Sequence, residues 1–258
     1  GNGELRVRPR TARGARRSRP GGAPHVCRLG AIVIVLVAWA ATPVRAEVAG
    51  SLAIDSDYQL RGVSLSDNEP VASVTLSYDH GSGAYGDIAA IGVATRRTGV
   101  EFLGYVAHLG YARRLPSGAS LDVGVANSRI TTYVHRRYSY DYTEVYVGLS
   151  KGDLSAHVYL SPDYIGEAGP TAYVELEGAL RPARHWRVFG HIGLLAPLRE
   201  SSGPDERRAR LDLRAGIARE LGNLELHVVG TTTSTAPYYP PGYLQKRTAL
   251  TVGAVYFF

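Results

Sequence analysis

The feature that most constrains the fold of this chain is an alternation of apolar with small or polar residues, which recurs from residue 49 to residue 258. In the last segment, 246–258, one register is apolar throughout and the other is largely small or polar. The apolar register consists of Leu250, Val252, Ala254, Tyr256 and Phe258. Successive side chains of a β-strand point to opposite faces, so this pattern predicts a strand that separates two different solvents.

Segments of this kind recur along the chain after residue 46, where helical periodicity does not appear. They lie near 49–60, 70–79, 84–94, 100–113, 119–128, 143–151, 153–161, 170–181, 185–195, 208–220, 223–233 and 246–258. Bacterial outer-membrane barrels contain an even number of antiparallel strands. The sequence therefore predicts an all-β protein, an antiparallel up-and-down transmembrane β-barrel of twelve strands.

The connections between these segments are sorted by length. Those after the second, fourth, sixth, eighth and tenth segments are short, namely "DHGSG", "RLPSG", "KGD", "RPARH" and "ELGN". The others are mostly longer, such as "SRITTYVHRRYSYDYT" and "APLRESSGPDERR", with "RRTG" as the brief exception. Short periplasmic turns that alternate with longer outer loops are typical of an inserted barrel, whereas a soluble sandwich has no reason to sort them.

Aromatic residues near the ends of the predicted strands favour the same interpretation. Five of the tyrosines are expected in interfacial girdles, although tyrosine is also simply a good strand former. They are Tyr58, Tyr78, Tyr85, Tyr111 and Tyr256. Tyr256 and Phe258 are expected to face lipid, and barrel closure would then hold the last residue in place.

Residues 1–46 differ from the rest of the chain. They hold nine arginines against one acidic residue, which leaves 20 basic and 22 acidic residues downstream, so the formal charge of +6 belongs to this segment. The basic stretch, an apolar run of about 13 residues and the small residues Val44 and Ala46 predict a Sec-type signal peptide cleaved after Ala46. Residues 47–258 then form the barrel, and Cys27 leaves with the leader. Without a basic body, nucleic acid is not an expected partner.

The stretch "SDYQLRGVSLSDNEPVASVTLSYDHGSGAY" resembles the opening of the TorF porin family, a proteobacterial group of exported outer-membrane proteins of hypothetical function. The segment 142–164 is similar to the central hairpin of that family, and the likeness continues at lower quality to Phe258. After Tyr85 this chain reads "GDIAAIGVAT", where family members commonly carry a tryptophan and a Ser-Asn pair. The resemblance implies a barrel and a pore, and it brings no catalytic residue or substrate.

Sequence motifs of enzymes and cofactor sites are weak here. Gly81, Gly83 and Gly86 spell G-x-G-x-x-G, but a strand follows where the dinucleotide motif needs a helix, so a hairpin turn is expected. His80 and Ser82 fall in the same turn. The histidines at 108, 157, 191 and 227 stand singly on predicted inward faces, without a metal-ligand spacing such as H-x-x-x-H. We expect no catalytic residues, no metal and no cofactor.

Charges of both signs fall on the predicted inward faces, where they would set the field felt by a permeating ion. The residues expected to line the channel and tune its selectivity are Asp57, Arg61, Glu175, Glu177, Arg187, Arg210, Asp212, Arg214 and His227. The sequence thus predicts a porin of the Gram-negative outer membrane that passes small hydrophilic solutes or ions, with lipid, lipopolysaccharide and the barrel-assembly machinery as partners. The alternatives are a largely closed structural or surface-binding barrel, in which the charges pair into a plug, and a barrel enzyme acting on lipid.

Overall fold

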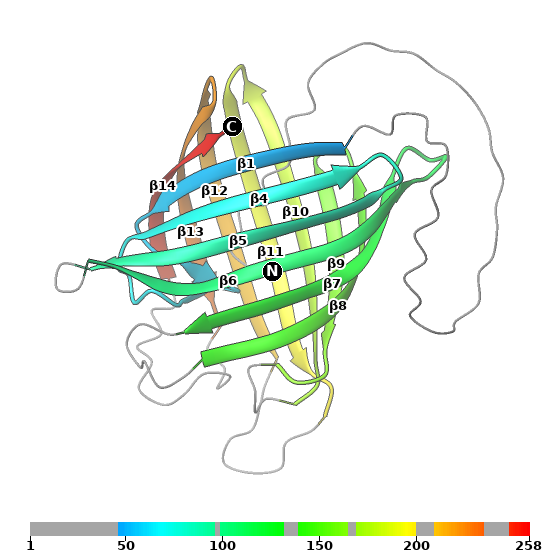
Figure 1. Ribbon diagram of the computed structural model, residues 1–258, viewed down its shortest axis with the longest axis horizontal. Coiled ribbons are helices and arrows are strands. Elements are labelled where there is room, and N and C mark those ends of the chain that lie inside the picture. The colour runs from blue at the N-terminus through cyan, green and yellow to red at the C-terminus, as the bar shows by residue number, and fades with distance from the viewer. Residues whose placement is uncertain (1–45, 96–98, 132–138, 165–168, 200–208, 235–247) are drawn as a thin grey trace.

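The computed structural model describes residues 46–95, 99–131, 139–164, 169–199, 209–234 and 248–258. Every regular element in these ranges is a strand, and twelve of the strands form one closed barrel (Figure 1). The barrel strands are β1 (Ala46–Asp55), β4 (Val71–His80), β5 (Ala84–Thr95), β6 (Gly99–Arg114), β7 (Ser120–Thr131), β8 (Ser139–Lys151), β9 (Leu154–Ser161), β10 (Thr171–Ala183), β11 (Trp186–Pro197), β12 (Arg210–Leu221), β13 (Leu224–Thr233) and β14 (Thr248–Phe257).

Each strand of the barrel pairs antiparallel with its neighbours in the sequence, and β1 closes the circle by pairing with both β4 and β14. A separate two-stranded sheet is formed by β2 (Gln59–Leu60) and β3 (Val63–Ser64). The predicted fold class, an antiparallel barrel of twelve strands, is confirmed. No helix in the described ranges has the length and hydropathy needed to cross a bilayer.

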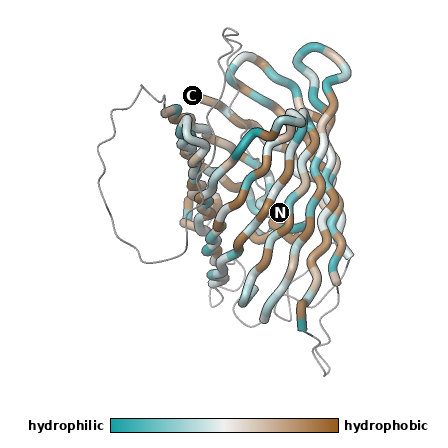
Figure 2. The backbone as a smooth tube through the Cα atoms, turned by 90° about the vertical axis from the view of Figure 1, so that its right-hand side faces the viewer, coloured by the Kyte–Doolittle hydropathy of each residue, from teal (hydrophilic) through white to brown (hydrophobic). Residues whose placement is uncertain are grey.

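The apolar side chains of the barrel face outward. In β9 exposed and buried residues alternate without a break, with leucine, alanine and valine outside and serine, histidine and tyrosine inside. Figure 2 shows the same alternation of hydrophobic and hydrophilic residues along the strands. A soluble barrel would place its apolar residues inside, so this orientation is the one that a hydrocarbon surrounding requires.

Five short connections lie at one end of the barrel, which we call the short-turn mouth. The residues between the paired strands there are 81–83, 115–119, 152–153, 184–185 and 222–223. In the first of these turns the Gly83 N–H donates to the His80 carbonyl over 2.8 Å, and Gly83 has φ +100°. The predicted hairpin turn at the G-x-G-x-x-G stretch is therefore confirmed.

The last residue is held at the seam where the barrel closes. β1 and β14 share five residue pairs, and the Phe258 N–H and carbonyl add two hydrogen bonds of 3.0 Å to Gly50. The Phe258 ring lies over Gly50, where a Cβ would collide with it. Tyr256 and Phe258 both point outward and are about half exposed or more.

Two details of the sequence-based prediction are wrong. The segment predicted as a strand over 49–60 leaves the barrel wall after Asp55. Tyr58 and Tyr85 lie inside the barrel, whereas Tyr78, Tyr111 and Tyr256 are exposed on its outer face. Only these last three fit an interfacial girdle.

A charge placed on the middle of the outer face should destabilise the barrel. Leu213 and Leu221 are both exposed on the same face of β12, but Leu213 lies within the apolar band whereas Leu221 follows Arg219 at the end of the strand. We expect Leu213→Lys to lower the free energy of unfolding by about 2–4 kcal/mol and Leu221→Lys by about 0–1 kcal/mol, because the cost depends on depth in the bilayer. Urea unfolding in lipid vesicles measures both, and equal losses would contradict the orientation.

Candidate functional site: the plugged interior

Residues 56–70, which join β1 to β4, turn into the barrel instead of projecting from it. We call this segment the plug. Leu60, Arg61, Leu65 and Ser66 are each at most 2 % exposed. The plug leaves and re-enters the wall at the end opposite the short-turn mouth. It contacts the far wall of the barrel, where β9 and β10 lie opposite β1 and β4 in the strand order and β8 lies next to β9.

The plug is organised by its own hydrogen bonds. Leu60 pairs with Val63 across a two-residue turn whose central residues, Arg61 and Gly62, have φ of 47° and 77°. Positive φ at both positions is the requirement of a type I′ hairpin turn. The Asp57 carboxylate accepts hydrogen bonds from Gln59 Nε2 (2.7 Å), Ser64 Oγ (2.6 Å) and Ser66 Oγ (2.7 Å). Asp57 therefore holds the hairpin together.

Arg61, at the tip of this hairpin, docks against the far wall. Its Nη2 donates to both carboxylate oxygens of Glu144 on β8, over 2.8 and 2.7 Å. Four tyrosine rings surround the guanidinium, with centroid distances to Cζ of 4.1 Å for Tyr173, 4.9 Å for Tyr164, 5.9 Å for Tyr159 and 6.0 Å for Tyr142. Cation–π contacts and a buried carboxylate both favour a guanidinium here.

The level of the barrel that holds the plug is packed with apolar and aromatic side chains. One cluster joins the plug residues Tyr58, Leu60, Val63 and Leu65 to wall residues that include Ile91, Val106, Ile130, Tyr146 and Leu195. Side chains therefore fill the interior of the barrel at this level.

The interior also carries polar groups, and its histidines lie beside carboxylates. The contacts are His108 Nδ1 with Asp87 (2.8 Å), His157 with Glu175 (3.5 Å) and Asp122 (3.6 Å), His191 with Asp212 (3.0 Å) and Glu177 (3.2 Å), and His227 Nε2 with Asp55 (2.8 Å). Two further ion pairs each reach across an intervening strand: Arg187 on β11 with Glu225 on β13 (2.6 Å), and Arg214 on β12 with Glu177 on β10 (2.9 Å).

All nine residues predicted to line the channel lie inside the barrel, but they divide into two groups. Those that are buried are Asp57, Arg61, Glu175, Arg210, Asp212 and His227. Those with side chains that are partly open to solvent are Glu177, Arg187 and Arg214, with 26 %, 22 % and 19 % exposed. Asp57 and Arg61 belong to the plug and not to a wall strand, so their predicted placement on the wall is wrong.

One cluster in the interior contains the donor types of a metal centre. Among the described residues, Glu175, Glu177 and His191 bring one ligand atom each within 4.8 Å of one another. Sequence spacing did not indicate this cluster, because His191 reaches the two glutamates through strand pairing, with Glu177 directly opposite His191. The alternation did place all three residues on inward faces.

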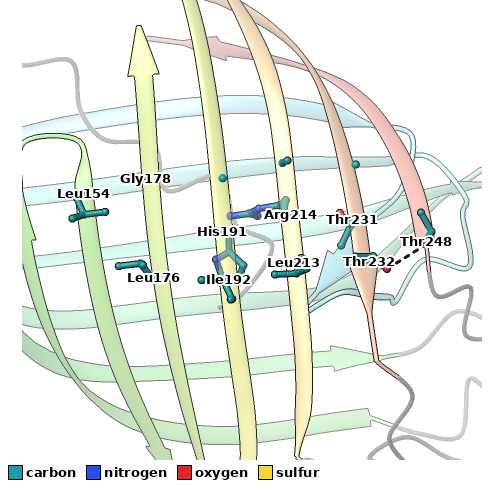
Figure 3. A pocket seen from close by; sticks show the side chains of 13 residues that line it. Leu154, Leu176, Gly178, His191, Ile192, Leu213, Arg214, Thr231, Thr232 and Thr248 are labelled. Atoms are coloured by element: carbon teal, nitrogen blue, oxygen red, sulfur yellow. Dashed lines mark hydrogen bonds between the residues drawn. The ribbon is translucent and has the colours of Figure 1, made fainter.

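The barrel also has a groove of about 610 Å³ in its outer surface, across β9 to β14. Its floor consists of the small residues Gly178, Gly190, Ala215 and Gly230, which are paired across four strands. Figure 3 shows leucines such as Leu154, Leu176 and Leu213 among its lining side chains. The groove therefore opens on the apolar outer face of the barrel, and His191 and Arg214 also border it.

Comparisons with known proteins agree with the barrel architecture. The family described as "Bacterial protein of unknown function (Gcw_chp)" matches residues 38–236. No curated protein matches the sequence. The solved structure of the KdgM porin superposes with a TM-score of 0.50 at 10 % identity, over 81 % of this chain and 99 % of that one.

A loop L8 deletion mutant of OmpT, an outer membrane protein of Vibrio cholerae, has a TM-score of 0.42 at 9 % identity, over 83 % of this chain and 99 % of that one. At such identities the likeness concerns the fold alone. The chain has the fold of a porin-like outer-membrane barrel.

Proposed function

This chain belongs to the Gcw_chp family of bacterial proteins of unknown function, and we propose that it is an outer-membrane porin through which small hydrophilic solutes or ions diffuse passively. The observation that supports this most directly is the closed barrel with an apolar outer face and ionisable groups inside. In this proposal the barrel lies in the outer membrane of a Gram-negative cell, among lipid and lipopolysaccharide. The barrel-assembly machinery inserts it, and it has no catalytic role.

The resemblance of the plug to the TorF porin family accords with the proposal. The residues that carry it include Ser56, Asp57, Tyr58, Arg61 and Gly62. In the structure these residues form the stem and tip of the plug. The sequence that carries this resemblance thus coincides with the segment that fills the interior.

The charges of the interior indicate which solutes would pass. Among the described residues, the buried ionisable side chains comprise six carboxylates and two arginines, together with four histidines. The carboxylates are Asp57, Asp122, Glu144, Glu175, Asp212 and Glu225, and the arginines are Arg61 and Arg210. An excess of carboxylates in a low-dielectric wall attracts cations and repels anions. We therefore infer a preference for cations.

The packed plug favours one alternative, a barrel that is largely closed and serves a structural or surface-binding role. A plug in which Leu60, Arg61, Leu65 and Ser66 are at most 2 % exposed leaves little room for solutes at its level. In the porin proposal the plug narrows the interior, so wild-type conductance is small.

Planar-bilayer recording of the refolded protein tests the proposal. We expect small discrete current steps with a reversal potential that shows cation preference, measured in buffers that contain a chelator. Glu177 is the interior glutamate of β10 that is more open to solvent, so Glu177→Lys should shift the reversal potential toward anions.

Leu221→Lys places a lysine on the outer face and should leave the reversal potential unchanged. Absence of current steps in the wild-type protein would favour the closed barrel. Lipid hydrolysis by the refolded protein would favour an enzyme.

A further inference from the structure

We propose that Glu175, Glu177 and His191 form a binding site for a first-row divalent cation, on the side of the plug that faces the short-turn mouth. The two glutamates lie two residues apart on the inner face of β10, and His191 lies opposite Glu177 on β11. Tyr173, whose ring contacts Arg61 of the plug, precedes them on the same face. The site therefore lies directly beyond the tip of the plug, and it is a feature additional to passive conduction.

The orientation of the His191 ring is fixed by a neighbouring strand. Asp212 Oδ1 lies 3.0 Å from His191 Nε2. A carboxylate accepts a hydrogen bond, so Nε2 of the ring carries a proton. Tyr173 Oη donates to the same Asp212 carboxylate over 3.2 Å and so helps to hold it in place beside His191. A histidine whose second nitrogen is held by a carboxylate is the usual arrangement of a metal-bound imidazole.

The other nitrogen of the ring faces two carboxylates. His191 Nδ1 lies 3.2 Å from Glu177 Oε1 and 4.0 Å from Glu175 Oε2. When Nδ1 carries a proton, it donates to Glu177 Oε1. A divalent cation bound between the three atoms would take the place of this proton, and each atom would then serve as a ligand.

The surrounding charges favour a cation at this place. Three carboxylates, of Glu175, Glu177 and Asp212, surround His191, and the Arg214 guanidinium contacts Glu177 Oε1 over 2.9 Å. Glu175 and Asp212 are buried, so their field is weakly screened.

A glycine leaves room for the Tyr173 and Asp212 side chains beside the site, and the site is reached past Glu177. A Cβ at Gly193, the residue opposite Glu175, would collide with the Tyr173 hydroxyl and lie 2.8 Å from Asp212 Oδ2. The partial exposure of the Glu177 side chain provides a path from solvent to the cluster.

The donor set indicates the class of ion. Two carboxylates and one imidazole suit Zn²⁺, Co²⁺ or Mn²⁺, which bind oxygen and nitrogen ligands at about 2.0–2.2 Å. A soft ion such as Cu⁺ prefers sulfur, and the cluster offers none. Water would complete the coordination.

Titration of the refolded protein in detergent with Co²⁺ tests the site, since bound Co²⁺ reports its coordination by visible absorption. We expect saturable binding of one ion, displaced by Zn²⁺. Glu175→Gln and His191→Ala each remove a ligand and should abolish the absorption band. Asp212 contacts His191 but is not a proposed ligand. Asp212→Asn should therefore weaken Co²⁺ binding about tenfold to a hundredfold. Glu225→Gln, an interior carboxylate paired with Arg187, should leave the affinity unchanged.

Circular dichroism of each variant establishes that it has refolded. If Glu175→Gln does not refold, the more exposed Glu177→Gln takes its place. The proposal is overturned if the wild-type protein does not bind Co²⁺, or if Glu225→Gln weakens binding as much as Glu175→Gln does. His191 would then be an imidazolium held among the carboxylates. Because the titration does not measure current, its outcome is independent of whether the barrel conducts.

Discussion

Excising residues 58–66 and joining Asp57 to Asp67 through a Gly-Ser linker is expected to raise single-channel conductance severalfold. The excised hairpin carries the apolar residues that fill the interior and the arginine that docks on the far wall. The wall of twelve strands remains closed without it, because β1 still pairs with β4 and β14. A barrel of this size then has room for water where the hairpin lay.

The matched control for this excision is Asp67→Asn. Asp67 is exposed at the outer turn of the plug and has φ +58°, a conformation that asparagine tolerates. It should conduct as the wild-type protein does. Planar-bilayer recording at fixed salt compares the three proteins, and a wild-type conductance equal to that of the excised variant would show that the plug does not restrict the interior.

Removing the partner of Arg61 should cost more stability than removing both members of the pair. Glu144→Leu leaves a buried guanidinium without its carboxylate, and we expect it to lower the free energy of unfolding by about 3–5 kcal/mol. The double variant Arg61→Met with Glu144→Leu replaces the pair by apolar side chains and should recover most of this loss.

Urea unfolding in lipid vesicles measures these effects. Residues 47–258 contain Trp186 as their one tryptophan, so its fluorescence reports unfolding. If the double variant is as unstable as Glu144→Leu alone, the Glu144 carboxylate stabilises the strands of the wall and not the docked Arg61. The plug would then be held by its apolar contacts.

The alternation of the sequence was sufficient to predict most of the wall. The segment predicted over 153–161 is β9, Leu154–Ser161, and the segment predicted over 100–113 is β6, Gly99–Arg114. The prediction succeeds because each wall residue faces either the outside or the interior, and the two environments select different side chains.

The same rule explains why the plug was missed. Beyond Asp55 the period of two continues through Tyr58 and Leu60 and resumes at Val63 and Leu65, because the plug is itself a hairpin. A period of two does not distinguish a strand of the wall from a strand inside it. The apolar residues within a predicted outer loop were the available signal, since an exposed loop has no need of them.

The proposed metal site could not be predicted from the sequence for a different reason. Alternation placed Glu175, Glu177 and His191 on inward faces, but their proximity depends on the register between β10 and β11. That register shifts between Leu180 and Ala183, near the turn that joins the strands. An irregularity of this kind changes which residues lie opposite one another, and the turn length alone does not reveal it.

Both ends of the plug, which we call its feet, are hydrogen-bonded to strands of the wall. At one foot the Ser56 N–H donates to the Val252 carbonyl over 2.9 Å and Ser56 Oγ accepts from the Val252 N–H over 3.0 Å; at the other, the Ala94 N–H donates to the Pro70 carbonyl over 2.7 Å. Any swing of the plug must therefore hinge within residues 57–69, and it can leave only through the end where both feet are anchored. A force that pulls the plug out of the barrel acts directly on β1. It would therefore load the pairing of β1 with β14 first, because this pairing has the fewest residue pairs among the described barrel strands.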